Sequence, residues 1–150
     1  MTQPDPAPRS RSRRLLGLDP GERRIGVAIS DELGLYAHPR PAILSSRGGD
    51  PIETVAKIVD EEQVDEVVVG LPLTLAGADS EQTRAARAFV RRLRGRLEVP
   101  VTEWDERLSS VQAARTVKGA TKRRSGELDS AAAGVVLQAV LDARRGRAAR

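Results

Sequence analysis

Residues 15–30 decide the fold, and they read LLGLDPGERRIGVAIS. Two apolar runs, 15–18 and 25–30, flank the turn-rich stretch DPGERR, a pattern typical of two strands of an antiparallel hairpin. A carboxylate, Asp19, follows the first run directly and precedes a Pro-Gly turn. An ionised carboxylate is costly to bury without a partner, so this position calls for a cation, a ligand or a set of hydrogen bonds.

Outward from the hairpin, the pattern changes from strands to alternating helices and strands. Two prolines within 35–44 favour an edge strand, and Asp50 followed by Pro51 predicts the start of a helix that reaches Gln63. The run EVVVG is typical of a central, covered strand. The further elements that we expect are a strand over 66–70, a helix from Asp79 or Ser80 to about Gly95, a strand over 99–104, and helices near 107–118 and 126–145.

This order predicts an α/β protein, with an antiparallel ribbon continued by parallel crossover units. The result is a mixed five-stranded sheet whose first three strands are antiparallel and whose faces are covered by helices. The ends of strands in such sheets are common ligand sites.

Composition restricts the chemistry and the location. A chain of 150 residues fits one domain of ordinary size, and it contains no cysteine and a single histidine, His38. A thiolate or histidine-rich metal site is therefore excluded, and any metal has to be held by oxygen. Neither an apolar leader nor a run of membrane-spanning length is present, so we expect a cytoplasmic protein without a membrane partner.

The formal charge of +4 comes from the two ends of the chain. Residues 1–14 and 142–150 each hold four arginines and one aspartate, which leaves 17 basic and 19 acidic residues between them. Both ends lack apolar periodicity, so we expect a disordered basic tail over 1–14, a single domain over 15–142 and a basic C-terminal tail over 143–150. Solvated ends are the common interpretation of such tails, and contact with a polyanion is the alternative.

Carboxylates on three separate elements are placed where they could converge. Asp19 ends the first strand, Asp105 and Glu106 end the fifth, and Asp129 borders the apolar face of the last helix. Each also has an ordinary structural explanation. Asp19 could initiate a turn, Asp105 could cap the following helix, and Glu106 or Asp129 could be a first-turn acid.

Four segments in this order and spacing resemble one family. LGLDPGERRIGVAISD, VVVGLPLTLAG, DERLSS and LDSAAAGVVLQAVLD are similar to the YqgF family, also called RuvX, of the ribonuclease H-like fold. The resemblance covers nearly all of residues 15–142. It implies a nuclease that matures the 5′ end of 16S ribosomal RNA, or a resolvase of four-way DNA junctions.

The resemblance also implies a metal site. Asp19, Glu106 and Asp129 would be the catalytic carboxylates and the ligands of Mg²⁺ or Mn²⁺, hard cations that prefer oxygen. Arg107 would lie near a phosphate oxygen. Asp105 is a less certain ligand, since adjacent strand residues face opposite sides of a sheet.

Two groups of basic residues could contact phosphates without reading sequence. One is a stripe on the helix that begins near residue 80, and the other is a loop that precedes the last helix. A solvated helix face and a soluble loop are the alternatives. The residues are Arg84, Arg87, Arg91 and Arg94 in the stripe, and Lys118, Lys122, Arg123 and Arg124 in the loop.

The expected partner is therefore a nucleic acid, either precursor ribosomal RNA or branched DNA, with ribosomal particles as a further partner. We expect a monomer or a homodimer, and resolution of a junction would require a dimer. A sugar-kinase or actin-like ATPase needs a second lobe that 150 residues cannot hold. A non-catalytic ribosome or nucleic-acid binding protein of the same fold is the remaining alternative.

Overall fold

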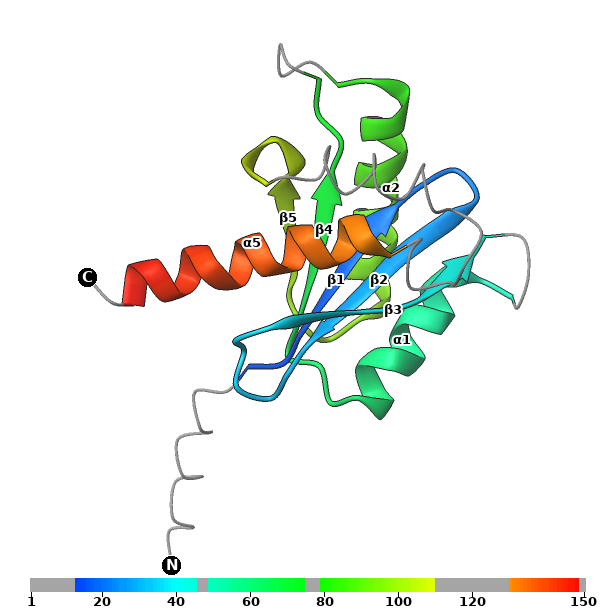
Figure 1. The fold of residues 1–150 in the computed structure, drawn as a ribbon. Coiled ribbons are helices and arrows are strands. Elements are labelled where there is room, and N and C mark those ends of the chain that lie inside the picture. Colours follow the sequence, from blue (N-terminus) through cyan, green and yellow to red (C-terminus); the bar gives the residue numbers. More distant parts are fainter. Residues whose placement is uncertain (1–12, 46–48, 75–78, 110–129, 149–150) are drawn as a thin grey trace, which may run out of the picture.

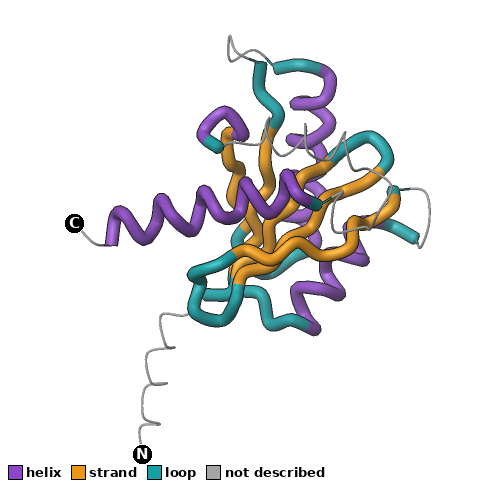
Figure 2. Tube along the Cα trace, in the orientation of Figure 1, coloured by secondary structure: helices purple, strands orange, loops and turns teal. Residues whose placement is uncertain are grey.

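A computed structural model of the chain describes residues 13–45, 49–74, 79–109 and 130–148. Within these ranges, five strands form one mixed sheet in the order β3-β2-β1-β4-β5, with helices on both faces (Figure 1, Figure 2). The strands are β1 (Leu15–Pro20), β2 (Arg24–Ser30), β3 (Ala37–Leu44), β4 (Glu66–Leu71) and β5 (Val101–Asp105). The helices are α1 (Pro51–Glu61), α2 (Glu81–Arg96), the short 3-10 helix η1 (Glu106–Leu108) and α5 (Ala131–Ala148).

The pairing of the strands confirms the predicted α/β topology. β1 pairs antiparallel with β2 and β2 antiparallel with β3, whereas β1 pairs parallel with β4 and β4 parallel with β5. β4 is buried along its whole length, as its apolar sequence predicts for a strand covered on both faces. β3 lies at the edge, where Pro39 and Pro41 are tolerated because one side of the strand makes no ladder bonds.

Alternation along the strands divides the core into two layers. Leu16 and Leu18 of β1 face the layer that α1 and α2 cover, and Leu15 faces α5. The close approach of α5 depends on Gly17, where an added Cβ would lie 2.9 Å from the Cβ of Leu137. The helix therefore packs almost directly on the backbone of β1, across the face seen in Figure 1.

The predicted helix starts are confirmed in detail. The side chain of Asp50 accepts a hydrogen bond from the amide of Ile52, and Ser80, one of the two expected caps, accepts one from the amide of Thr83. The hydroxyl of Thr83 also donates to the carbonyl of Pro72 at 2.6 Å. This bond ties the start of α2 to the loop that follows β4.

The predicted C-terminal tail needs correction. α5 reaches residue 148, three residues past the end of the helix predicted near 126–145 and into the range 143–150 assigned to a disordered tail. Arg144 holds this part of the helix to the sheet, since it forms an ion pair at 2.7 Å with Glu66, a residue only 4% exposed. Burial raises the pKa of Glu66, but hydrogen bonds from Arg144 and Thr102 outweigh it and the pKa is lowered overall.

Other predictions about the ends and the late helices fall partly outside the described residues. The predictions for residues 1–12, for most of the helix near 107–118 and for residues 126–129 concern residues that the structure does not describe. Arg14 is described, and its amide donates to the carboxylate of Asp65. Among the described residues, no helix is both long enough and apolar enough to cross a membrane.

Candidate active site

Asp19 and Glu106 lie at the same edge of the sheet and on the same face. Asp19 stands two residues after Gly17, whose missing side chain faces α5, so alternation turns Asp19 to the α5 face as well. Glu106 follows the last residue of β5 and opens η1. Both lie at the carboxyl ends of parallel strands, and both are buried, with 8% of Asp19 and 6% of Glu106 exposed.

Gly70 of β4 separates the two carboxylates and gives them room. A Cβ added at Gly70 would lie 3.2 Å from Oε1 of Glu106 and 3.3 Å from Cγ2 of Val136 in α5. The carboxylate of Glu106 therefore lies over β4. Since neighbouring strands are about 4.8 Å apart, one strand spacing separates it from β1, which carries Asp19.

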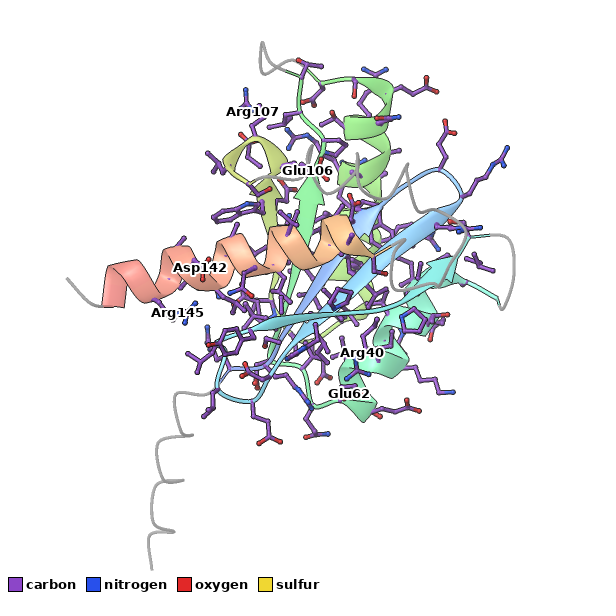
Figure 3. All side chains as sticks on the ribbon, in the orientation of Figure 1. Arg40, Glu62, Glu106, Arg107, Asp142 and Arg145 are labelled. Carbon is purple, nitrogen blue, oxygen red and sulfur yellow. The ribbon has the colours of Figure 1, made fainter. Side chains whose placement is uncertain are left out.

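Asp105 is occupied by a structural role. Its carboxylate caps η1 by accepting from the amide of Arg107, and it also accepts from the guanidinium of Arg107 at 2.6 Å. The hydrogen bond from the Arg107 side chain is the main cause that lowers the pKa of Asp105. This is the capping alternative from the sequence, and it leaves Glu106 as the acid of this pair that faces Gly70. Figure 3 shows Glu106 and Arg107 at the end of β5.

Asp129, the third predicted ligand, lies outside the described residues. Its neighbour in the chain, Ser130, is fully buried, and its Oγ accepts a hydrogen bond from the amide of Val27 at 2.9 Å. Val27 follows Gly26, the register partner of Asp19 on the neighbouring strand. The start of α5 is thus anchored one residue along β2 from the strand position opposite Asp19.

Asp19 and Glu106 are the kind of ligand that a hard divalent cation prefers, but two carboxylates are fewer than the three predicted from the sequence. In the described ranges, no group of three or more acidic or histidine side chains lies close enough to hold a metal. Asp19 and Glu106 supply two sets of oxygen donors, the kind that Mg²⁺ and Mn²⁺ prefer. The missing side chain of Gly70 lets the carboxylate of Glu106 lie over the backbone of β4, on the face to which Asp19 turns.

The predicted basic stripe on α2 is partly used in ion pairs. Arg87 bonds to Asp79 at 3.1 Å and to Glu103 at 3.3 Å, and Arg94 donates to the carbonyl of Val101 at 2.8 Å. Arg84 and Arg91 are exposed. The loop residues Lys118, Lys122, Arg123 and Arg124 lie outside the described residues.

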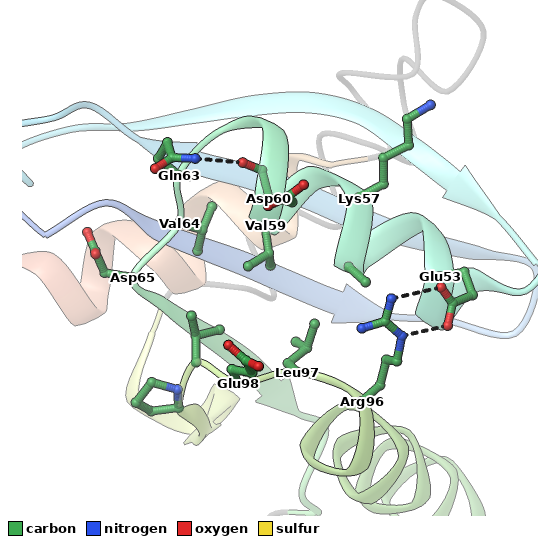
Figure 4. Close-up of a pocket in the computed structure, with 13 residues that line it drawn as sticks. Glu53, Lys57, Val59, Asp60, Gln63, Val64, Asp65, Arg96, Leu97 and Glu98 are labelled. Atoms are coloured by element: carbon green, nitrogen blue, oxygen red, sulfur yellow. Dashed lines mark hydrogen bonds and ion pairs between the residues drawn. The ribbon is translucent and has the colours of Figure 1, made fainter.

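Two cavities lie at opposite edges of the sheet. A groove of about 790 Å³ begins at Asp19 and runs between the β1–β2 turn and α2. A second cavity, of about 710 Å³, lies beyond the amino ends of β4 and β5, where Arg96 bonds to Glu53 at 2.8 Å (Figure 4). The second cavity is remote from Asp19 and Glu106. The groove reaches the candidate site at Asp19, but Ile25 and Phe89 in its lining belong to the face of the sheet that α1 and α2 cover, opposite the α5 face to which the two carboxylates turn.

Sequence reasoning missed the residues that shape the site without reacting. Gly70 clears space for Glu106, and Ser130 anchors the start of α5. The glycine in VVVGLP was a signal for the first, because a glycine inside an apolar strand indicates a close approach. The sequence offered no comparable signal for the bond to Ser130, which spans more than a hundred residues.

Comparison with solved structures identifies the fold. RuvC of Thermus thermophilus, in complex with a Holliday junction substrate, superposes with a TM-score of 0.53 and 17% identity over 89% of this chain and 96% of that chain. The fold is therefore the RuvC-like form of the ribonuclease H-like α/β fold.

Comparison of sequences narrows the class to a family. Residues 13–143 match the model of the RuvX family, described as Holliday junction resolvase. Two relatives carry the name "Putative pre-16S rRNA nuclease". The protein from Halothermothrix orenii is 39% identical over 86% of this chain and 94% of its own length, and that from Geobacillus kaustophilus is 41% identical over 88% and 99%. The chain belongs to the RuvX family.

Proposed function

We propose that this protein is a metal-dependent nuclease that hydrolyses phosphodiesters at the 5′ end of precursor 16S ribosomal RNA. The observation that carries the proposal is the placement of two buried carboxylates, Asp19 and Glu106, on one face of the sheet, with the bare backbone of Gly70 between them. Buried carboxylates on one face at the ends of nearby strands repel each other, and a divalent cation would offset that repulsion. Membership of the RuvX family and the names of the relatives support the choice of reaction and of RNA.

Each residue has a defined task in this proposal. Asp19, Glu106 and Asp129 hold the cations, and the anchored position of Ser130 supports a place for Asp129 near Asp19. Mg²⁺ or Mn²⁺, when bound, supplies the activation of water and the stabilisation of the leaving oxygen. Arg107, fixed by Asp105 and within 3.4 Å of the carbonyl of Thr74, offers positive charge at the rim, where a neighbouring phosphate would lie.

The test is cleavage of a 5′-extended 16S precursor by purified protein in the presence of Mg²⁺ or Mn²⁺. We expect Glu106→Gln to lower the rate about a hundredfold or more, which corresponds to a few kcal/mol of lost transition-state stabilisation. The matched control is Glu61→Gln, an exposed carboxylate on α1 that pairs with Lys57 at 3.9 Å. Full activity of Glu106→Gln would contradict the assignment of the site.

A four-way DNA junction is the comparison substrate. The description of the family and the junction bound to RuvC in the superposed structure favour this second candidate. Cleavage of the junction with the RNA left intact would move the assignment to a resolvase. Binding of either substrate without cleavage of both would identify a non-catalytic binding protein.

A further inference from the structure

The groove beside Asp19 is lined partly by apolar side chains, which the proposed hydrolysis at Asp19 and Glu106 does not need. Its α2 side includes the small or apolar side chains of Ala85 and Phe89 as well as Gln82 and Arg92, and Ile25 of β2 also lines it. Phe89 is only partly buried, because it packs on the edge of the core and leaves the rest of its ring in the groove. The volume of about 790 Å³ falls within the range of sites that hold ligands of nucleotide size.

Charged side chains of both signs line this groove, the arginines Arg24 and Arg92 and the acids Asp19 and Glu22. Arg24, at the start of β2, and Arg92, on α2, both line it, and neither belongs to the stripe predicted from the sequence. Arg92 bonds to Asp50 at 2.8 Å, with 57% of the arginine side chain and 44% of the aspartate side chain exposed. An exposed ion pair of this kind adds little to the free energy of folding. A phosphate can therefore replace Asp50 as the partner of Arg92.

We propose that the groove binds an unpaired nucleotide of the RNA strand, across the carboxyl end of β1 from the phosphodiester that lies at Asp19 and Glu106. The base lies on the apolar floor against Phe89, and its phosphate contacts Arg24 and Arg92. The inference rests on the proposed function, since that function puts RNA at Asp19, and it adds the part of the substrate that the protein grips.

The chemistry of the lining favours a single strand over a duplex. A duplex keeps its bases stacked inside and presents mainly phosphate and sugar to a protein. An apolar surface does not bind these polar groups favourably. An unpaired base exposes a flat apolar face, and such faces stack on aromatic side chains largely without regard to sequence. A concave surface that combines apolar side chains such as Phe89 with the arginines Arg24 and Arg92 matches the second case.

The test measures binding rather than cleavage, in the background of Glu106→Gln, so that the probe stays intact. The probe is a short single-stranded RNA that carries the fluorescent base 2-aminopurine, titrated with Mg²⁺ present. Ala85→Phe fills the groove from an exposed position on α2, and we expect binding to weaken about tenfold. The control is Ala143→Phe on α5, which adds the same ring outside the groove and leaves the affinity unchanged.

Two further variants separate the base from the phosphate. Phe89→Leu keeps an apolar side chain against the core, and we expect about fivefold weaker binding together with a smaller change in 2-aminopurine fluorescence. Arg24→Ala weakens binding and lowers its dependence on salt, whereas Lys57→Ala, which removes the same charge on α1, changes neither. A thermal melt of each variant confirms that it is folded.

Unchanged affinity in Ala85→Phe would overturn the proposal. An equal loss of affinity for a blunt RNA duplex would overturn it too, because the groove would then not be recognising an unpaired base. Failure of the proposed nuclease function has a different signature: the single variant Glu106→Gln would still cleave the precursor, whatever the groove binds.

Discussion

Replacement of Gly70 by alanine is the sharpest perturbation of the candidate site, because it adds one methyl group between the two carboxylates. The new Cβ would lie 3.2 Å from Oε1 and 3.3 Å from Cγ of Glu106, and 3.3 Å from Cγ2 of Val136. These separations are tighter than ordinary van der Waals contact, which begins at 3.4 Å. Val136 is fully buried in α5 and held on all sides, so the side chain of Glu106 is the group that moves.

The cost in stability is small, and the cost in activity is large. Gly70 does not have a positive φ, so alanine fits its backbone and gains about 0.5–1 kcal/mol of conformational entropy relative to glycine. Overpacking at the new contacts costs about 1–3 kcal/mol. We therefore expect a net loss of about 0–2.5 kcal/mol in the free energy of unfolding, while displacement of a metal-binding carboxylate lowers the cleavage rate about ten- to a hundredfold.

The assay combines urea denaturation with the rate of cleavage of the 5′-extended precursor. The control is Gly95→Ala in α2, where an added Cβ meets no atom within 4 Å. Alanine there stabilises the helix by about 0.5–1 kcal/mol and leaves the rate unchanged. Full activity of Gly70→Ala would refute the placement of Glu106 in the reacting centre, and loss of activity only in proportion to unfolded protein would refute the claim that the effect is local.

The other predictions concern the contacts that hold α5 to the sheet. Arg144→Met deprives the buried Glu66 of its closest ion-pair partner, and we expect about 1–3 kcal/mol lower stability and a lower melting temperature. Because the pKa of Glu66 is lowered in the folded protein, its contribution to stability is complete above the ordinary value of 4.5 and is lost as the pH falls through the folded-state pKa. Urea titrations between about pH 6 and pH 3 should therefore show a shallower acid loss of stability in Glu66→Gln than in the natural protein. Ser130→Ala leaves the buried amide of Val27 without its acceptor, and we expect thermal or urea melts to show a loss of about 1–3 kcal/mol in the free energy of unfolding. A variant as stable as the natural protein would contradict this role for Ser130.

Local patterns were sufficient to predict most of the elements. EVVVG could only be a covered strand, the pair Asp50 and Pro51 fixed the start of α1, and the two prolines of β3 excluded a central place in the sheet. These features depend on neighbours in the chain, through caps, backbone angles and the alternation of apolar side chains. The parallel pairing of the later strands could be expected because helices separate them in the sequence, and parallel strands require such crossover connections.

The boundary between the last helix and the C-terminal tail was predicted only approximately. The helix was expected to end near 145 and the tail to begin at 143, because apolar periodicity fades there, whereas α5 reaches residue 148. This part of the helix is held by Arg144, which reaches Glu66 on β4, 78 positions away in the sequence. A residue whose stability comes from a distant partner looks unstructured when only its neighbours are considered.

The candidate site shows the same division. The sequence by itself determined which acids are available, namely Asp19, Glu106, Asp105 and Asp129, and that a metal site here is built mainly from oxygen ligands, since the chain has no cysteine and one histidine. Only the tertiary structure decided between adjacent acids, by giving Asp105 to Arg107 and turning Glu106 over the backbone of Gly70. The physical reason is that side-chain direction at the end of a strand depends on the packing of three strands and a helix, and such packing brings together residues whose distance in the chain carries no information about their distance in space.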